Sequence, residues 1–352
     1  MPPTLHSIAQ AVPEHVFTAD DAETRLCGVF EAQGEDPDLV RQLVRNSGIE
    51  QRYLARPPDY YLRERGLTAR NSTYHEVAIE LGVAASRDAL KAAGVEPAQV
   101  DLIVDTSCTG LMIPALDVYV ANQLGFRRDV RRMPLTETGC AAGATSLAFG
   151  SDYLLAHPGA TVLLLSVELP SLTFQLDDAT RANLVSAAIF GDGAAAVVLA
   201  EGPGPSPGLE HLAHETVLFP ATQKIMGFDL RTEGFRIVLS RRIPLLVKRE
   251  LRSCVDAFLK RQGVTLAEIG FFVLHPGGTK VLDSVRDVLE LSEEQVGASR
   301  RTLARYGNLS SASVHFVVRE LLDRGEVSPG QLGLLVAMGP GFTLELALQR
   351  GV

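Results

Sequence analysis

Residues 136–149, TETGCAAGATSLAF, decide how the rest of the chain is organised. Cys140 follows a turn-prone glycine, Gly139, and precedes a run of residues with helix-forming character. A thiol at the start of a helix lies near the positive end of the helix dipole, which favours the thiolate. The small residues that follow allow the helix to pack deep in a core. The stretch therefore predicts an activated thiol at a buried helix end.

Length and charge limit the class of protein. A chain of 352 residues exceeds what one hydrophobic core usually serves, so two domains or one large duplicated unit are expected. With a net charge of −9 and no long basic run, the chain is not expected to bind nucleic acid. No apolar run is long enough to cross a membrane, and the first residues lack the pattern of a signal peptide. These features predict a cytoplasmic protein.

The cysteines do not suggest a metal site. Cys27, Cys108, Cys140 and Cys254 are irregularly spaced, and no two of them form a CxxC pair. This spacing predicts neither a zinc site nor a disulfide framework.

Apolar strands and amphipathic helices alternate along the chain. Apolar runs predict buried strands at 101–108, 161–168, 193–200 and 271–278, and residues 333–348 are expected to supply the last two strands. Helices are expected at 36–54, 75–94, 115–125, 243–262, 279–290 and 308–325. Residues 55–74 and the basic stretch 127–132 are expected to be irregular. The Gly- and Pro-rich stretch 202–208 is the clearest linker, so the predicted domains are residues 1–205 and 206–352.

The two halves repeat the same order of motifs. The matching segments are LIVDTSCTG (102–110) with FFVLHPGG (271–278) and GDGAAAVVLA (191–200) with GPGFTLELAL (339–348). The helix opened by Cys140 corresponds in the same way to a helix opened by Asn308. Three similarities in one order predict a duplicated α/β unit. Because open α/β folds place their sites at strand and helix ends, we expect Cys140, His275 and Asn308 to converge.

Three residue types supply the candidate chemistry. Cys140 is the candidate nucleophile, although most buried cysteines are only structural. His275 ends an apolar strand, a context that the other histidines lack. Asn308 is a good N-cap residue, but its correspondence to Cys140 favours a functional role. An imidazole can hold a thiolate charged, and imidazole and amide can both donate to an oxyanion or enolate on a thioester.

Five motifs occur in one order: GCAAG around Cys140, IFGDGAAAVV at 189–198, LHPGG around His275, YGNLSSAS around Asn308 and GPGFT at 339–343. Together they resemble the chalcone synthase family, the type III polyketide synthases of the thiolase superfamily, and especially its bacterial members. The resemblance implies a duplicated thiolase-like fold of five layers, αβαβα, and a homodimer.

The resemblance also implies a reaction. Cys140 would take an acyl group from a starter acyl-CoA. His275 and Asn308 would stabilise the enolate that forms when malonyl-CoA loses carbon dioxide. Repeated Claisen condensations and a cyclisation would then release a phenolic or pyrone product. CoA thioesters are substrates in this scheme, and it implies no metal and no cofactor.

The resemblance further implies residues that shape the substrate pocket. Phe190 corresponds to the aromatic residue between the CoA tunnel and the acyl cavity, although it can also be a core residue. Ile237 stands at the second such aromatic position of plant members, which argues against the plant chalcone reaction. Phe228 is expected to shorten the cavity, and Cys108, which replaces a threonine of plant members, is expected to line it. The segments that shape the pocket also contain Glu168, Thr173 and Ser310.

Two further segments are expected to contact the substrate. Because CoA carries phosphates, the mouth of its tunnel should be basic. Arg41 and Arg45 share one face of the helix that corresponds to the CoA-contacting segment, although this face can also be simply solvated. The loop formed by Gly339, Pro340 and Gly341 is expected to close over the site, since its residues favour a rigid turn.

Three alternatives remain open at this point. An initiating-type 3-oxoacyl-ACP synthase also uses Cys, His and Asn, but it condenses once and with an acyl carrier protein. A papain-like cysteine hydrolase has the same chain order, although the duplication and the Gly-x-Gly strands argue against it. An inactive thiolase-fold scaffold would keep the architecture without a cysteine that reacts with acyl-CoA.

Overall fold

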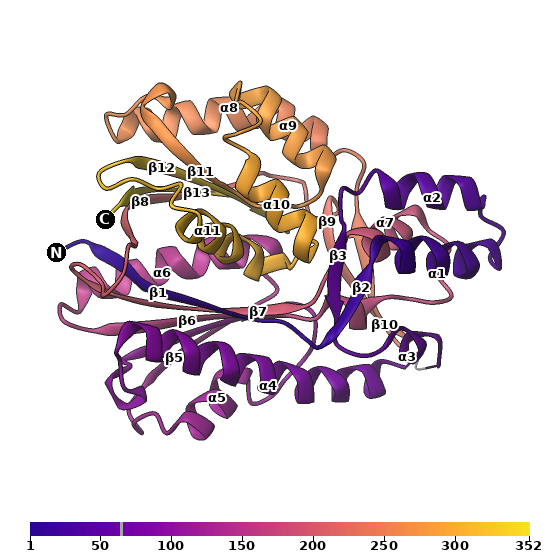
Figure 1. Cartoon of the computed structure of the whole chain (residues 1–352), viewed down its shortest axis with the longest axis horizontal. Coiled ribbons are helices and arrows are strands. Elements are labelled where there is room, and N and C mark those ends of the chain that lie inside the picture. Colours follow the sequence, from indigo (N-terminus) through magenta and orange to yellow (C-terminus); the bar gives the residue numbers. More distant parts are fainter. Residues whose placement is uncertain (64–65) are drawn as a thin grey trace.

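The chain forms a large sheet with helices on its outer faces and between its two halves (Figure 1). The computed structural model describes residues 1–63 and 66–352. Nine strands follow the order β11-β12-β13-β8-β1-β7-β6-β4-β5. The first half contains β1 Pro3–Ala11, β4 Leu102–Ser107, β5 Arg131–Thr136, β6 Thr161–Glu168 and β7 Gly193–Glu201. The second half contains β8 Leu209–Leu218, β11 Ile269–Leu274, β12 Leu332–Gly339 and β13 Thr343–Gly351.

Two helices fill the space between the halves, namely α6 Ala142–Ala156 and α11 Ser313–Asp323. Further helices cover the outer faces (Figure 1). These are α4 Leu67–Ala93 and α5 Leu116–Leu124 on the first half, and α8 Ile243–Arg261 and α9 Thr279–Leu289 on the second. The layers therefore follow the order αβαβα, which confirms the predicted fold class.

The helix α6 can occupy the centre because its side chains are small. Gly143 approaches the other half so closely that an added Cβ would lie 2.2 Å from the carbonyl oxygen of Ser311. A Cβ on Gly150 would lie 2.9 Å from the side chain of Leu164 on β6. The prediction of a deeply packed helix after Cys140 is therefore confirmed, and glycine is required at its crossing with the second half.

The remaining elements surround the end of the sheet where the Cys140 turn lies. Two small sheets pair β2 His15–Thr18 with β3 Gln51–Leu54, and β9 Met226–Arg231 with β10 Gly234–Leu239. The other helices are α1 Ala19–Glu31, α2 Pro37–Arg45, α3 Pro58–Arg63, α7 Arg181–Ile189 and α10 Gly297–Tyr306. Short 3-10 turns at Gly139–Ala141, Pro170–Thr173 and Ser310–Ala312 connect strands to buried helices.

The helix predicted at 36–54 is wrong beyond Arg45. The helix α2 ends there, Gly48 adopts a φ of +72°, and the chain continues as the strand β3, which pairs with β2. Glycine tolerates this left-handed conformation, so Gly48 turns the chain from helix to strand. The four-residue strand is too short for its alternating burial to stand out in the sequence.

The stretch 55–74 is more regular than predicted. It contains α3, which begins with Pro58, and the first turns of α4; residues 64–65 lie outside the described residues. Proline suits the first position of a helix because no hydrogen bond is lost there. The basic stretch 127–132 also ends inside the edge strand β5 rather than in a loop. The predicted end of α4 at Gly94 is confirmed, with a φ of +67°.

The helix predicted from residue 308 begins later. Asn308 precedes the turn Ser310–Ala312, and α11 starts only at Ser313, so Asn308 is not its N-cap. The division into residues 1–205 and 206–352 stays a prediction, since strands of both parts share one sheet and pair through Thr4 and Glu210. Among residues 1–63 and 66–352, none of the helices has the length and apolar character that a bilayer crossing needs.

Candidate active site

A cavity of about 1180 Å³ is lined by residues from both halves of the chain. Cys140, His275 and Asn308 all line it, although they lie far apart in the sequence. Cys140 reaches the cavity from the turn before α6, His275 from the end of β11, and Asn308 from the segment before α11. The structure thus brings the three side chains to one cavity, while their catalytic roles stay predictions.

Cys140 is a buried thiol that is neutral at rest. It lies in the turn Gly139–Ala141, and Gly139 has a φ of +61°. Its Sγ lies 3.5 Å from the hydroxyl oxygen of Ser310. Burial raises the pKa of Cys140 to about 12, against the smaller effect of the hydrogen bond to Ser310. The loss of solvation thus outweighs the helix dipole, on which the expectation of a thiolate rested.

His275 is a buried and neutral imidazole. Its backbone N–H donates to the carbonyl oxygen of Val336 at 2.9 Å, which extends the pairing of β11 with β12 by one residue. Burial lowers the pKa of His275 to about 4. Within the described residues, Nδ1 has no hydrogen-bond partner. The ring is therefore an uncharged group at the cavity wall, with a buried Nδ1 that has no partner among the described residues.

Asn308 is oriented by its own neighbourhood. Its Oδ1 accepts hydrogen bonds from the backbone N–H of Ser310 at 2.8 Å and from the hydroxyl of Ser313 at 3.4 Å. Since a backbone N–H can only donate, this contact fixes Oδ1 inward and leaves the NH₂ group as the free donor. The backbone N–H of Asn308 donates to Ile189 O at 2.8 Å, and its carbonyl accepts from Gly191 N at 3.1 Å.

A buried carboxylate supports the floor of the site. Glu168 accepts from the backbone N–H of Cys108 at 3.1 Å and from the hydroxyl of Ser311 at 2.7 Å. Burial raises the pKa of this carboxyl group. The Cys108 Sγ lies 3.6 Å from both oxygens of Glu168 and from the Ser310 hydroxyl, which also faces Cys140. Ser310 therefore lies between the two thiols.

Most residues that were predicted to shape the pocket do line the cavity. These are Cys108, Phe190, Phe228, Ile237, Ser310, Pro340 and Gly341. Thr173, Glu168 and Gly339 lie behind the wall instead. The Thr173 hydroxyl donates to Pro170 O at 2.8 Å, and a Cβ on Gly339 would lie 2.7 Å from the Cβ of Ala141.

Arg41 and Arg45 do not line the cavity. Arg45 donates to Glu23 on α1 through two nitrogens at 2.9 Å, and Arg41 pairs with Asp38 and lies near Glu23. The contacts of both arginines with Glu23 hold α2 against α1. The segment does reach the cavity through other residues, namely Leu43, Asn46 and Ser47.

Four cations that the sequence analysis missed line the cavity: Arg181, Lys224, Arg241 and Lys280. All four side chains are exposed, and none of them forms an ion pair with another of the described residues. They come from four separate segments, before or within α7, β9, α8 and α9. No local pattern groups such residues in the sequence, so only the folded chain reveals them as a set.

The neutral state of His275 leads to a pH prediction. Because burial lowers its pKa to about 4, the ring gains a proton only as the pH approaches that value, and not near the usual 6.5. Since the resemblance implies that His275 assists the decarboxylation of malonyl-CoA, we expect the rate of that step to stay level as the pH falls through 6.5. The measurement is the pH profile of kcat, with circular dichroism at each pH as the control for folding. A decline centred near 6.5 contradicts this assignment.

Family models for chalcone and stilbene synthases match almost the whole chain. The N-terminal domain model matches residues 3–203 and the C-terminal domain model matches residues 210–352. The fold and the family models together define a condensing enzyme with a thiolase-like architecture. The chain belongs to the chalcone and stilbene synthase family and is a type III polyketide synthase. Such enzymes are decarboxylating acyltransferases that perform iterative condensations and a cyclisation on malonyl-CoA and acyl-CoA.

Individual relatives agree over the full length. The 1,3,6,8-tetrahydroxynaphthalene synthase of Streptomyces peucetius subsp. caesius is 40% identical, with 99% of this chain and 93% of the relative covered. A putative chalcone synthase of Bacillus subtilis is 32% identical, with 97% of each chain covered. The crystal structure of 1,3,6,8-tetrahydroxynaphthalene synthase from Streptomyces coelicolor has a TM-score of 0.93, with 31% identity and 99% of each chain covered. These likenesses do not favour the single-condensation 3-oxoacyl-ACP synthase, and they exclude a papain-like hydrolase.

Proposed function

We propose that Cys140 carries the growing chain and that His275 and Asn308 activate malonyl-CoA. The observation that supports this assignment is the presence of all three side chains in one cavity. In the loading step, the Cys140 Sγ attacks the thioester carbonyl of an acyl-CoA. His275, which is neutral, accepts the thiol proton and returns it to the departing CoA thiolate. The acyl group is then bonded to Cys140.

Malonyl-CoA supplies the carbon nucleophile in the next step. Its C–C bond to the carboxylate breaks, carbon dioxide leaves, and the electron pair remains as a thioester enolate. Asn308 NH₂ can donate to the enolate oxygen without a charge, and so can neutral His275 in the tautomer that carries its proton on the nitrogen facing the substrate, opposite to the tautomer that accepts the thiol proton. The enolate carbon attacks the acyl group on Cys140, so that a C–C bond forms and the C–S bond breaks. Loss of carbon dioxide drives the cycle, so the proposal requires no cofactor.

We further propose that the product is a polyhydroxylated aromatic compound, with 1,3,6,8-tetrahydroxynaphthalene as the first candidate. The support is the full-length similarity to synthases that bear that name. Two-carbon malonyl units can build a naphthalene skeleton without another starter. The test is mass spectrometry of products from malonyl-CoA alone, compared with malonyl-CoA plus short and long acyl-CoA starters. A strict need for a second starter contradicts this product, and a strict need for an acyl carrier protein contradicts the reaction type.

The four unpaired cations at the cavity are proposed to bind the phosphates of CoA, in place of Arg41 and Arg45. Reversing the charge in Lys280→Glu should raise KM for malonyl-CoA by about fivefold, the size of one exposed charge contact, with little change in kcat. The matched control is Lys260→Glu, an exposed lysine of α8 that does not line the cavity. A thioester of N-acetylcysteamine, which has no phosphate, should show no change. An equal rise in KM for that substrate contradicts the phosphate assignment.

A homodimer is proposed on two features. The strand β5 ends the nine-stranded sheet, and its backbone groups are available for pairing with a second copy. Exposed apolar side chains occur at Ile113, Leu111 and Phe149, with exposed fractions of 97%, 43% and 42%. Light scattering at micromolar concentration is the test, and a monomeric mass contradicts the proposal. A cytoplasmic location stays a prediction.

A further inference from the structure

The hairpin of β9 and β10 forms one wall of the cavity but is not part of the main sheet. It is a separate two-stranded sheet, and its residues Phe228, Leu230, Phe235, Ile237 and Leu239 line the cavity. A two-stranded sheet alone is marginally stable in water. The position of this wall relative to Cys140 therefore depends on contacts between the hairpin and its neighbours.

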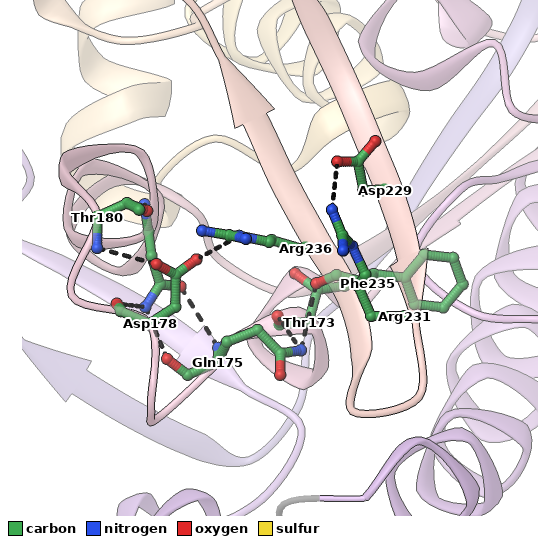
Figure 2. Close-up of polar contacts among 9 residues, drawn as sticks. Thr173, Gln175, Asp178, Thr180, Asp229, Arg231, Phe235 and Arg236 are labelled. Atoms are coloured by element: carbon green, nitrogen blue, oxygen red, sulfur yellow. Dashed lines mark hydrogen bonds and ion pairs between the residues drawn. The ribbon is translucent and has the colours of Figure 1, made fainter.

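The loop of residues 173–180 holds the hairpin at two points (Figure 2). The Gln175 side chain donates through Nε2 to the carbonyl oxygen of Phe235 at 3.2 Å. Arg236 donates through Nε to a carboxylate oxygen of Asp178 at 3.1 Å. Both contacts reach β10, and both come from outside the hairpin.

Gly234 allows this close contact. It begins β10 with a φ of +136°, and a Cβ at this position would lie 2.9 Å from Nε2 of Gln175. Any larger residue would strain the backbone and displace the amide. The glycine therefore brings the end of the hairpin within reach of the Gln175 side chain.

Contacts within the first half of the chain hold the loop of residues 173–180 in the conformation that presents Gln175 and Asp178 to the hairpin. Asn183 on α7 is 2% exposed, and its Nδ2 donates to the carbonyl oxygens of Gln175 at 2.7 Å and Asp178 at 2.8 Å. One oxygen of the Asp178 carboxylate accepts from the backbone N–H of Thr180 at 2.9 Å, and the other accepts from Arg236 (Figure 2). The Asp178 side chain is 9% exposed, whereas Arg236 is 44% exposed. The Asp178 carboxylate is thus held in place by contacts that do not depend on Arg236.

The same hairpin contains a second arginine–aspartate pair, with which the Arg236–Asp178 pair can be compared. Arg231 pairs with Asp229 at 3.3 Å, and both residues belong to β9 (Figure 2). Their side chains are 54% and 55% exposed. This pair stays within the hairpin and cannot fix it to the rest of the protein. Arg231 and Arg236 therefore carry the same charge on one hairpin in two different roles.

We propose that Gln175, Asp178 and Arg236 are positioning residues that fix the β9–β10 wall and thereby set the size of the polyketide that the cavity accepts. They touch neither the thiol nor the donors at Asn308 and His275, so they act through the wall. This inference rests on the polyketide-forming reaction proposed above. Releasing the wall should change which chain lengths are made while leaving decarboxylation intact.

The test compares Arg236→Gln with Arg231→Gln in the full-length protein. In Arg236→Gln we expect faster hydrogen exchange of residues 226–239 and a change of about threefold in the ratio of product chain lengths, the size of one partly exposed ion pair. Asp178→Asn should give the same change, and the double variant no more than either alone. Arg236→Lys, which keeps the charge, should restore most of the wild-type ratio. Arg231→Gln should leave both measurements unchanged.

Each outcome decides the proposal. Equal exchange and equal product ratios in Arg236→Gln and Arg231→Gln overturn it, as do additive effects of Asp178→Asn and Arg236→Gln. Gly234→Ala provides a second route, because its Cβ displaces Gln175 without changing a charge; an unchanged exchange rate there also counts against the proposal. Hydrogen exchange needs no turnover, so a wild-type protein that makes no polyketide would refute the proposed function and leave the positioning role measurable.

Discussion

Cys140→Ala is expected to abolish polyketide formation, with a loss on the order of a thousandfold or more. The reason is that the alanine side chain has no atom that can form the thioester to the growing chain. Products from malonyl-CoA are measured by mass spectrometry, and acyl transfer is followed as a mass increase of the intact protein. The matched control is Cys108→Ala, which removes a second cavity thiol beside Ser310 but keeps Cys140. We expect that control to retain product.

A second substitution of the same cysteine separates loading from decarboxylation. Cys140→Gln places an amide where the acyl thioester would lie, so decarboxylation of malonyl-CoA can continue without chain growth. Formation of wild-type product by Cys140→Ala removes the assignment of the nucleophile. If wild-type Cys140 gains no mass from an acyl-CoA and does not react with iodoacetamide, the chain is an inactive scaffold.

Asn308→Asp is expected to slow decarboxylation by roughly a hundredfold to a thousandfold, the usual cost of one donor to a developing oxyanion. The substitution is isosteric, and its carboxylate can still accept from Ser310 N–H and the Ser313 hydroxyl. The local structure is therefore retained, while the donor is lost and a negative charge faces the enolate. The measurement is the release of carbon dioxide from malonyl-CoA, which does not depend on chain growth.

A control variant distinguishes loss of the Asn308 NH₂ donor from a disturbance of the backbone turn that follows Asn308. Ser313→Ala removes one hydrogen bond to the same oxygen of Asn308, together with the bond from Leu309 N–H at 2.9 Å, but keeps the NH₂ donor. We expect Ser313→Ala to decarboxylate at close to the wild-type rate. A normal rate in Asn308→Asp, or an equal loss in both variants, contradicts the donor role.

The sequence, together with its resemblance to a known family, was sufficient to predict the layers of the fold and the presence of three residues at one cavity. Cys140, His275 and Asn308 each carry a local signal, since glycines or an apolar strand flank them and the two halves repeat the order. The repeat predicted a duplicated α/β unit, and the resemblance to the chalcone synthase family supplied the five layers. These features depend on local motifs and on an internal repeat, and both can be recognised in a single sequence.

The cation set and the cavity wall were not predictable in the same way. Arg41 and Arg45 have the spacing of one helical face, but the sequence does not show that this face meets Glu23 on α1. The strands β9 and β10 were missed because their residues are mostly half-buried or exposed, so that buried and exposed positions do not alternate clearly along them. The helix dipole at Cys140 was identified, whereas the cost of burying a thiolate depends on the whole surrounding fold.

The backbone link between Phe190 and Asn308 has a consequence for redesign. Segment 189–191 and Asn308 exchange two hydrogen bonds, so the aromatic wall residue and the amide donor move as one mechanical unit. A substitution at Phe190 that moves this backbone segment would therefore also move the donor that serves the enolate. Starter selectivity and the rate of decarboxylation are therefore coupled at this point. Directed evolution that improves one of them has to readjust the other.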